Sequence, residues 1–107
     1  IMATTVNFLD VIKSNSFGAK TVTIDVDLTN ITLHVQFRKE QKQGKLLRDC
    51  TEGDGITVVN SSTFIIDDFI VDFQIGTIYY DCKFTYQSGK VKSYFGGTFN
   101  VIQNVTD

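Results

Sequence analysis

Proline and tryptophan are absent from this 107-residue chain, and alanine occurs only at Ala3 and Ala19. Good helix formers are scarce overall, which disfavours long helices. Without proline, the chain lacks one common means of protecting the edge strand of a sheet from pairing with another molecule. These absences predict a strand-rich chain in which at least one sheet edge is open to partners.

Residues that carry catalytic or metal chemistry are also few. Cys50 and Cys82 are the two cysteines and His34 is the single histidine, so no C-x-x-C or paired-histidine spacing is present and zinc is not expected. No phosphate-binding loop, dinucleotide-binding glycine pattern or nucleophile elbow is present. Aspartates at positions 67, 68 and 72 lack the glycine-containing loop of known calcium motifs. We therefore expect no enzyme activity, cofactor or metal, and no small-molecule ligand.

Charge and targeting signals narrow the partners further. The formal net charge is −2, so nucleic acid is not an expected partner. Basic residues concentrate between positions 38 and 48, where a solvated hairpin or loop is favoured over the alternative of a phosphate-binding patch. Apolar runs are too short to span a membrane, and no secretory signal begins the chain. We interpret residues 1–107 as a single domain in which Met2 is the natural start and Ile1 a tag remnant. The two cysteines are then expected to be reduced.

What the chain has in abundance is β-formers, including nine phenylalanines and four tyrosines. Residues 21–28 and 31–38 alternate strictly between apolar and polar, with a change of phase at the break between them. Residues 77–86 and 91–102 read as a long hairpin, and Gly96-Gly97 suggests a bulge or a close backbone contact. Shorter strands are expected over 45–50, 56–59 and 63–66. Such a succession of strands and turns is typical of an all-β sandwich or barrel of about seven to nine antiparallel strands.

The alternation also predicts which side chains form the core. The inward phase should bury Val22, Ile24, Val26, Leu33, Val35, Phe37, Tyr80, Cys82, Phe84 and Phe99. Residues 67–76 do not alternate clearly. They have either one helical turn or an apolar loop that plugs one end of the fold.

Two regions are candidate interfaces. Val6, Asn7, Phe8 and Leu9 form an expected edge strand without charge until Asp10, which could pair with another chain, be exchanged between protomers or fold back on its own sheet. Tyr79 and Tyr94 are expected on the outward phase of the last hairpin or beside its glycines. There they would be either binding anchors or ordinary cross-strand packing pairs.

Four segments in the last third of the chain, residues 76–84, 86–92, 97–101 and 104–106, follow one another in a characteristic order and spacing, and residues 33–38 and 55–57 precede them. In this order and spacing the chain resembles a group of small bacteriophage tail and baseplate domains, similar to the N-terminal domain of phage baseplate upper proteins. The resemblance extends over residues 20–107. Residues 67–75 depart from it, since they lack the Ala-, Leu- and Pro-containing stretch of the group.

This resemblance implies an immunoglobulin-like antiparallel β-sandwich. It also implies a non-catalytic virion structural protein of tail, baseplate or fibre, assembled in the host cytoplasm and in contact with other virion proteins and with itself as a homo-oligomer. The alternative is a carbohydrate-binding or adhesion module that recognises a host surface glycan through exposed tyrosines. Because the shared motifs belong to the fold, they point to no particular partner.

Overall fold

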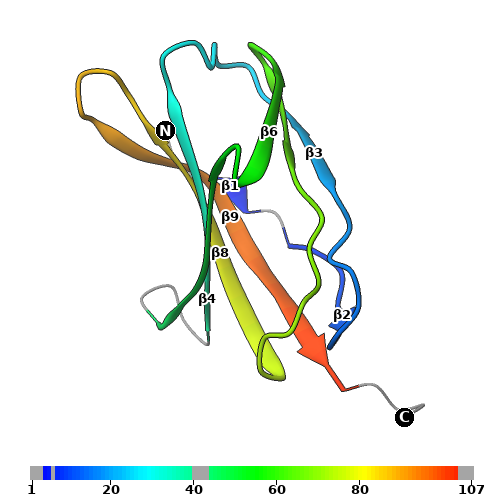
Figure 1. The fold of residues 1–107 in the computed structure, drawn as a ribbon. Coiled ribbons are helices and arrows are strands. Elements are labelled where there is room, and N and C mark those ends of the chain that lie inside the picture. The colour runs from blue at the N-terminus through cyan, green and yellow to red at the C-terminus, as the bar shows by residue number, and fades with distance from the viewer. Residues whose placement is uncertain (1–3, 6, 40–43, 104–107) are drawn as a thin grey trace.

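The computed structural model of the chain describes residues 4–5, 7–39 and 44–103. These residues contain nine strands and no helix, so the prediction of an all-β chain is confirmed (Figure 1). The strands in chain order are β1 (Thr4–Thr5), β2 (Val11–Ile12), β3 (Lys20–Thr23), β4 (Thr32–Lys39), β5 (Leu46–Glu52), β6 (Gly55–Asn60), β7 (Thr63–Ile66), β8 (Gly76–Thr85) and β9 (Val91–Ile102).

The strands follow one continuous, curled sheet in the order β1-β9-β8-β4-β5-β6-β7-β3, with β2 also paired to β9. β1 and β2 run parallel to β9, and β5 runs parallel to β6. The sheet is therefore mixed, and the expectation of a purely antiparallel arrangement is wrong. β1 and β2 are distant from β9 in sequence, so no hairpin fixes their direction and they are free to run parallel to it.

β4, β8 and β9 form the longest wall of the molecule, and here the predicted alternation is confirmed. Val35 lies opposite Cys82, and Phe37 lies opposite Tyr80, so the inward phases of the two strands coincide. Seven of the predicted core residues are buried: Leu33, Val35, Phe37, Tyr80, Cys82, Phe84 and Phe99.

The chain leaves this wall through a tight corner between β5 and β6. Gly53 and Gly55 both have positive φ, 84° and 105°, which glycine adopts without steric cost. Thr51 pairs with Gly55 across the corner, and the Gly53 amide donates to the Ile56 carbonyl at 2.9 Å. The corner lets β6, β7 and β3 stand on the other side of the core from β8 and β9 (Figure 1).

The segment between β7 and β8 has no helical turn, so of the two expectations the helical turn is wrong and the segment is an apolar extended stretch. Val71 and Phe73 are buried, whereas Ile70 is exposed. The backbone is extended, and Val71 exchanges hydrogen bonds with the chain at Ser14 and Asn15. The inward side chains Phe69, Val71 and Phe73 alternate with a period of two. The exposed Ile70 is outside this alternation and made the spacing resemble that of a helix.

β3 is shorter than the strand predicted over residues 21–28. Its predicted core residues Val22, Ile24 and Val26 are only half-buried, although they have the predicted phase, and Leu28 is buried. The chain bends away after Thr23 but still follows the β6–β7 hairpin, since the amides of Ile24 and Leu28 donate to Ser62 and Ser61. These three side chains stay partly accessible because no strand covers the other edge of β3 within the described chain.

Candidate binding slot between β3 and β9

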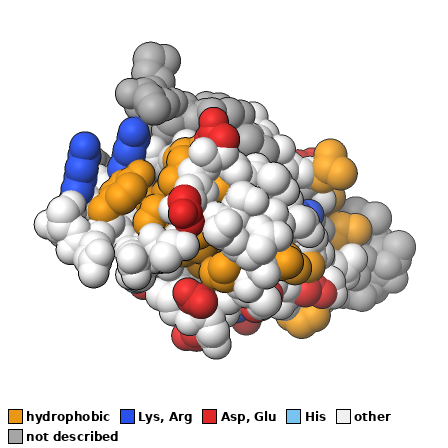
Figure 2. Space-filling view, turned by 90° about the horizontal axis from the view of Figure 1, so that it is seen from above, with side chains coloured by type: hydrophobic (Ala, Val, Ile, Leu, Met, Phe, Trp, Pro, Cys, Tyr) orange, Lys and Arg blue, Asp and Glu red, His pale blue; other side chains and the backbone are white. Residues whose placement is uncertain are grey.

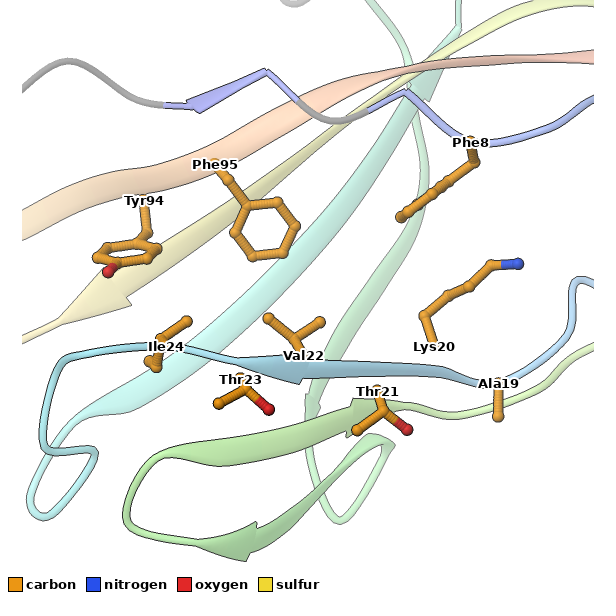
Figure 3. A pocket seen from close by; sticks show the side chains of 9 residues that line it. All are labelled: Phe8, Ala19, Lys20, Thr21, Val22, Thr23, Ile24, Tyr94 and Phe95. Atoms are coloured by element: carbon orange, nitrogen blue, oxygen red, sulfur yellow. The ribbon is translucent and has the colours of Figure 1, made fainter.

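The curled sheet does not close, and a hollow of about 600 Å³ remains where β3 faces β9 (Figure 3). We call this hollow the β3–β9 slot. Its walls come from three places: β3 and the residues beside it, the middle of β9, and the N-terminal strap, which we define as residues 7–10. The lining residues are Phe8, Ala19, Lys20, Thr21, Val22, Thr23, Ile24, Tyr94 and Phe95.

The lower wall in Figure 3 is β3, a terminal strand of the sheet. The amide of Ile24 donates to Ser62 of the neighbouring hairpin, so the backbone groups of the even-numbered residues point toward β7. The amides and carbonyls of Thr21 and Thr23 therefore point away from β7, because successive residues of a strand alternate. No backbone partner for them is found among the described residues.

The upper wall is β9, whose register with β8 shifts at one position. Cys82 pairs with Phe95 while Lys83 pairs with Ser93, which leaves Tyr94 as the extra residue of a bulge. As a result both Tyr94 and Phe95 point toward β3 (Figure 3). The ring of Tyr94 stacks on the buried Phe84 with centroids 4.8 Å apart. Of the two places expected for Tyr94, the outward phase is therefore excluded.

A hydrogen bond bridges the slot at one end. The Tyr94 hydroxyl donates to Oδ1 of Asp25 over 2.6 Å, and the two residues are 69 positions apart in sequence. This hydrogen bond to a carboxylate raises the pKa of Tyr94 above its ordinary value. The contact ties β9 to the segment after β3, so it limits how far the two walls can separate.

The opposite end of the slot combines aromatic rings with a cation. The Lys20 ammonium lies 5.5 Å from the ring centroid of Phe8 and 4.9 Å from that of Phe17, within the range of cation–π attraction. Phe8 itself stacks on Tyr80 with centroids 4.4 Å apart. Lys20 forms no ion pair with any carboxylate in the described part of the chain. The end of the slot therefore has a half-buried positive charge that a ligand anion could neutralise.

The N-terminal strap lies along the edge of β9. The Phe8 amide donates to the Thr98 carbonyl, and Asn7 Oδ1 accepts from the Thr98 amide, both over 3.0 Å. The predicted edge strand is thus interrupted, because Asn7, Phe8 and Leu9 lie between two short strands rather than in one; Val6 falls outside the described residues. Leu9 is 88% exposed, whereas Phe8 turns inward.

Tyr79 lies on the other face of the sheet from the slot. It is half-exposed on β8, between Arg38 of β4 and Thr98 of β9 in the pairing registers. The structure therefore separates the two tyrosines that the sequence analysis grouped together. His34 is also half-exposed, and its Nδ1 lies 3.2 Å from Oδ1 of Asp49.

The residues of β3 were not predicted as a site, although the sequence has one signal for it. Lys20 has the same phase as Val22 and Ile24, so it places a charge at the start of an otherwise apolar strand face. A charged residue on the inward face of an edge strand is a known means of controlling what pairs with it.

The two cysteines lie on the same face and flank Val35. Cys50 and Cys82 each pair with Val35 from opposite sides, so two interstrand spacings, roughly 10 Å, separate their Cα atoms. A disulfide needs a Cα separation below about 7 Å, and both thiols are free. Burial raises the pKa of Cys82 to about 12 and also raises the pKa of Cys50.

On the face that Figure 2 shows, apolar side chains lie in several separate groups, interrupted by acidic and neutral polar atoms. Within the described ranges, no three His, Cys, Asp or Glu side chains gather as metal ligands would. The same ranges contain no helix that could cross a bilayer. Comparison of the chain with protein-family models and with curated protein sequences finds no match.

Proposed function

We propose that this chain is a non-catalytic assembly module of a bacteriophage tail, baseplate or fibre that acts through protein–protein contacts. Its partners are other virion proteins and further copies of itself, and it resides in the virion after assembly in the host cytoplasm. The observation that supports this proposal best is the β3–β9 slot, an apolar hollow beside a sheet edge whose backbone groups have no partner in the described chain. Such edges pair readily with other chains.

The resemblance of residues 20–107 to phage tail and baseplate domains supplies the biological setting. In this proposal the curled sheet is a variant of the immunoglobulin-like sandwich. β3, β6 and β7 correspond to one layer, and β4, β8 and β9 correspond to the other. The corner at Gly53 and Gly55 is the passage between the layers. In a symmetric virion part, the same surface of each copy of this domain would contact a neighbouring copy.

Sedimentation velocity from micromolar to millimolar concentration tests the self-assembly, with negative-stain electron microscopy of the assembled fractions. We expect one oligomer of fixed mass, because closed symmetry gives one preferred assembly. The fraction of the protein in this oligomer should grow with concentration. A strict monomer over the whole range, without a complex when neighbouring virion proteins are added, would contradict the proposal.

The N-terminal strap is the first surface to test in that assembly. Leu9 is 88% exposed and its replacement removes no packing, so Leu9→Asp should weaken self-association at least about tenfold without loss of fold. Val59→Asp is the matched control, since Val59 is 55% exposed on β6, away from the strap. If the two changes weaken self-association equally, the interface does not lie on the strap.

A second function is favoured by Tyr79 alone. An aromatic ring flanked by Arg38 and Thr98 on an accessible sheet face is a suitable platform for a sugar ring and its hydroxyl groups. A glycan array with wild type and Tyr79→Ala separates this candidate from the first. Binding that is lost in Tyr79→Ala would establish the carbohydrate-binding alternative, and an array without signal would remove it.

A further inference from the structure

We propose that the β3–β9 slot accepts an extended strand from a partner protein, whose backbone pairs with Thr21 and Thr23 and whose acidic side chain reaches Lys20. The inference rests on the proposed function as a protein-contact domain, and it identifies where one such contact is made and with what chemistry.

The backbone of β3 determines the conformation of the partner. The amides and carbonyls of Thr21 and Thr23 face the slot and are unpaired within the described chain. An added strand satisfies alternate donors and acceptors along an edge and gains affinity from the main chain. A helix cannot do so, because its own backbone groups are already bonded along the helix.

The interior of the slot determines the partner's side chains. Val22 and Ile24 from below, and Phe95 from above, present apolar surface to the hollow (Figure 3). The volume of about 600 Å³ lies within the usual range of ligand-binding clefts, roughly 300–1,000 Å³. Side chains at alternate positions of the partner strand would point into this hollow, so two apolar residues separated by one residue are required.

Lys20 determines where the partner's charge must lie. Its ammonium rests against Phe8 and Phe17 and has no carboxylate partner among the described residues. A carboxylate there forms a charge-assisted hydrogen bond in a partly desolvated place. Lys20 is two residues before Val22, so the acidic residue is two positions from the nearer apolar one. The recognised pattern is apolar-x-apolar-x-acidic in an antiparallel partner, and the reverse order in a parallel one.

Synthetic peptides test the proposal directly. The probes are Val-Thr-Val-Thr-Glu and its reversed sequence, each with a tryptophan on a short Gly-Ser extension. The protein has no tryptophan, so the fluorescence anisotropy of the peptide reports binding without background. We expect one of the two orders to bind and to perturb the amide resonances of Thr21 and Thr23. Failure of both orders at millimolar peptide would overturn the inference.

Matched changes on both partners show whether Lys20 and the backbone are responsible. A peptide with Lys in place of Glu should bind wild type at least about tenfold more weakly, and the variant Lys20→Glu should reverse this preference. Lys90→Glu has the same change of charge on an exposed turn and should bind as wild type does. Equal binding of the two peptides by wild type would overturn the proposed role of Lys20.

Proline at β3 tests the edge itself. Thr21→Pro removes an amide that faces the slot and leaves the β7 hydrogen bonds in place, so the fold should persist while peptide affinity falls at least about tenfold. N-methylation of alternate peptide amides should have the same effect. Unchanged affinity in either case would overturn strand pairing.

Two further outcomes separate this inference from the proposed function. If the protein assembles but no peptide binds, the slot inference falls and the assembly proposal stands. If Thr21→Pro abolishes self-association, the occupant is a second copy of this chain, which overturns the assignment to a different protein.

Discussion

The tight corner between β5 and β6 allows the steric reasoning to be tested quantitatively, because two glycines there share a positive φ but differ in their surroundings. Gly53 has φ of 84° and Gly55 has φ of 105°. A Cβ at Gly53 would have no atom within 4 Å, whereas a Cβ at Gly55 would lie 2.7 Å from Sγ and 2.9 Å from Cβ of Cys50. Alanine at each position therefore separates backbone strain from a clash.

The expected magnitudes follow from these distances. Gly53→Ala should lower the free energy of unfolding by about 1–2 kcal/mol, since the left-handed conformation costs an L-residue roughly that amount. Gly55→Ala has at least this strain, since its φ lies further from the left-handed minimum, and it also forces a methyl group against a buried neighbour, which adds about 1–3 kcal/mol. Cys50 is 1% exposed, so its side chain cannot move aside into solvent. The total for Gly55→Ala is thus about 2–5 kcal/mol.

Urea unfolding followed by circular dichroism and tyrosine fluorescence measures both losses. A third variant that combines Gly55→Ala with Cys50→Ala removes the sulfur, one of the two clashing atoms, and should recover part of the loss. The coupling energy from the double-mutant cycle should lie within about 0.5–3 kcal/mol. Equal losses for the two glycine variants, together with no coupling to Cys50, would refute the steric reasoning.

Three other results are expected. Phe84→Ala should cost about 3–5 kcal/mol in urea unfolding, since Phe84 is fully enclosed, and a loss below about 1 kcal/mol would contradict that enclosure. The hydrogen bond to Asp25 raises the pKa of Tyr94 above 10.0, so the stability difference from Tyr94→Phe should be present below pH 10 and vanish as the pH rises through the raised value. That difference should stay under about 1 kcal/mol because the site is solvent-exposed, and its persistence in strong alkali would contradict the assigned bond. Without reductant, thiol titration should find Cys50 and Cys82 free after unfolding and slow to react before it; a mass lower by two hydrogens would contradict this.

The wall of β4, β8 and β9 could be predicted from sequence because its strands are long and strictly alternating. Over eight residues in β4 and ten in β8, a wrong register would turn every apolar side chain into solvent. Val35 and Cys82 therefore lie where the pattern placed them. A short strand has too few residues for its apolar pattern to fix its register or direction. β1 and β2 have two residues each, and pattern alone could not show that they run parallel to β9.

The position of Tyr94 shows how one irregularity defeats a periodic prediction. Gly96-Gly97 predicts a bulge or a close backbone contact at these two residues. The structure has both features, but at different residues. The extra residue of the bulge is Tyr94, whereas at Gly96 an added Cβ would lie 2.8 Å from the Tyr80 carbonyl oxygen. Strict alternation back from the inward Phe99 would turn Tyr94 outward, whereas the extra residue at position 94 turns both Tyr94 and Phe95 toward β3.

The β3–β9 slot could not be predicted from sequence for a different reason. It exists because no strand of the described chain pairs with the second edge of β3. Alternation in β3 shows which side chains point inward, but not whether another strand will cover them. Lys20 decides how the uncovered edge behaves. A strand with an apolar residue opposite Lys20 would have to bury an unpaired ammonium, which costs several kcal/mol, so indiscriminate pairing is disfavoured. A strand with a carboxylate at that position removes the penalty and forms a charge-assisted hydrogen bond. The same side chain that protects the edge from most strands therefore selects the one strand that complements it, and specificity arises from the rejected partners as much as from the accepted one.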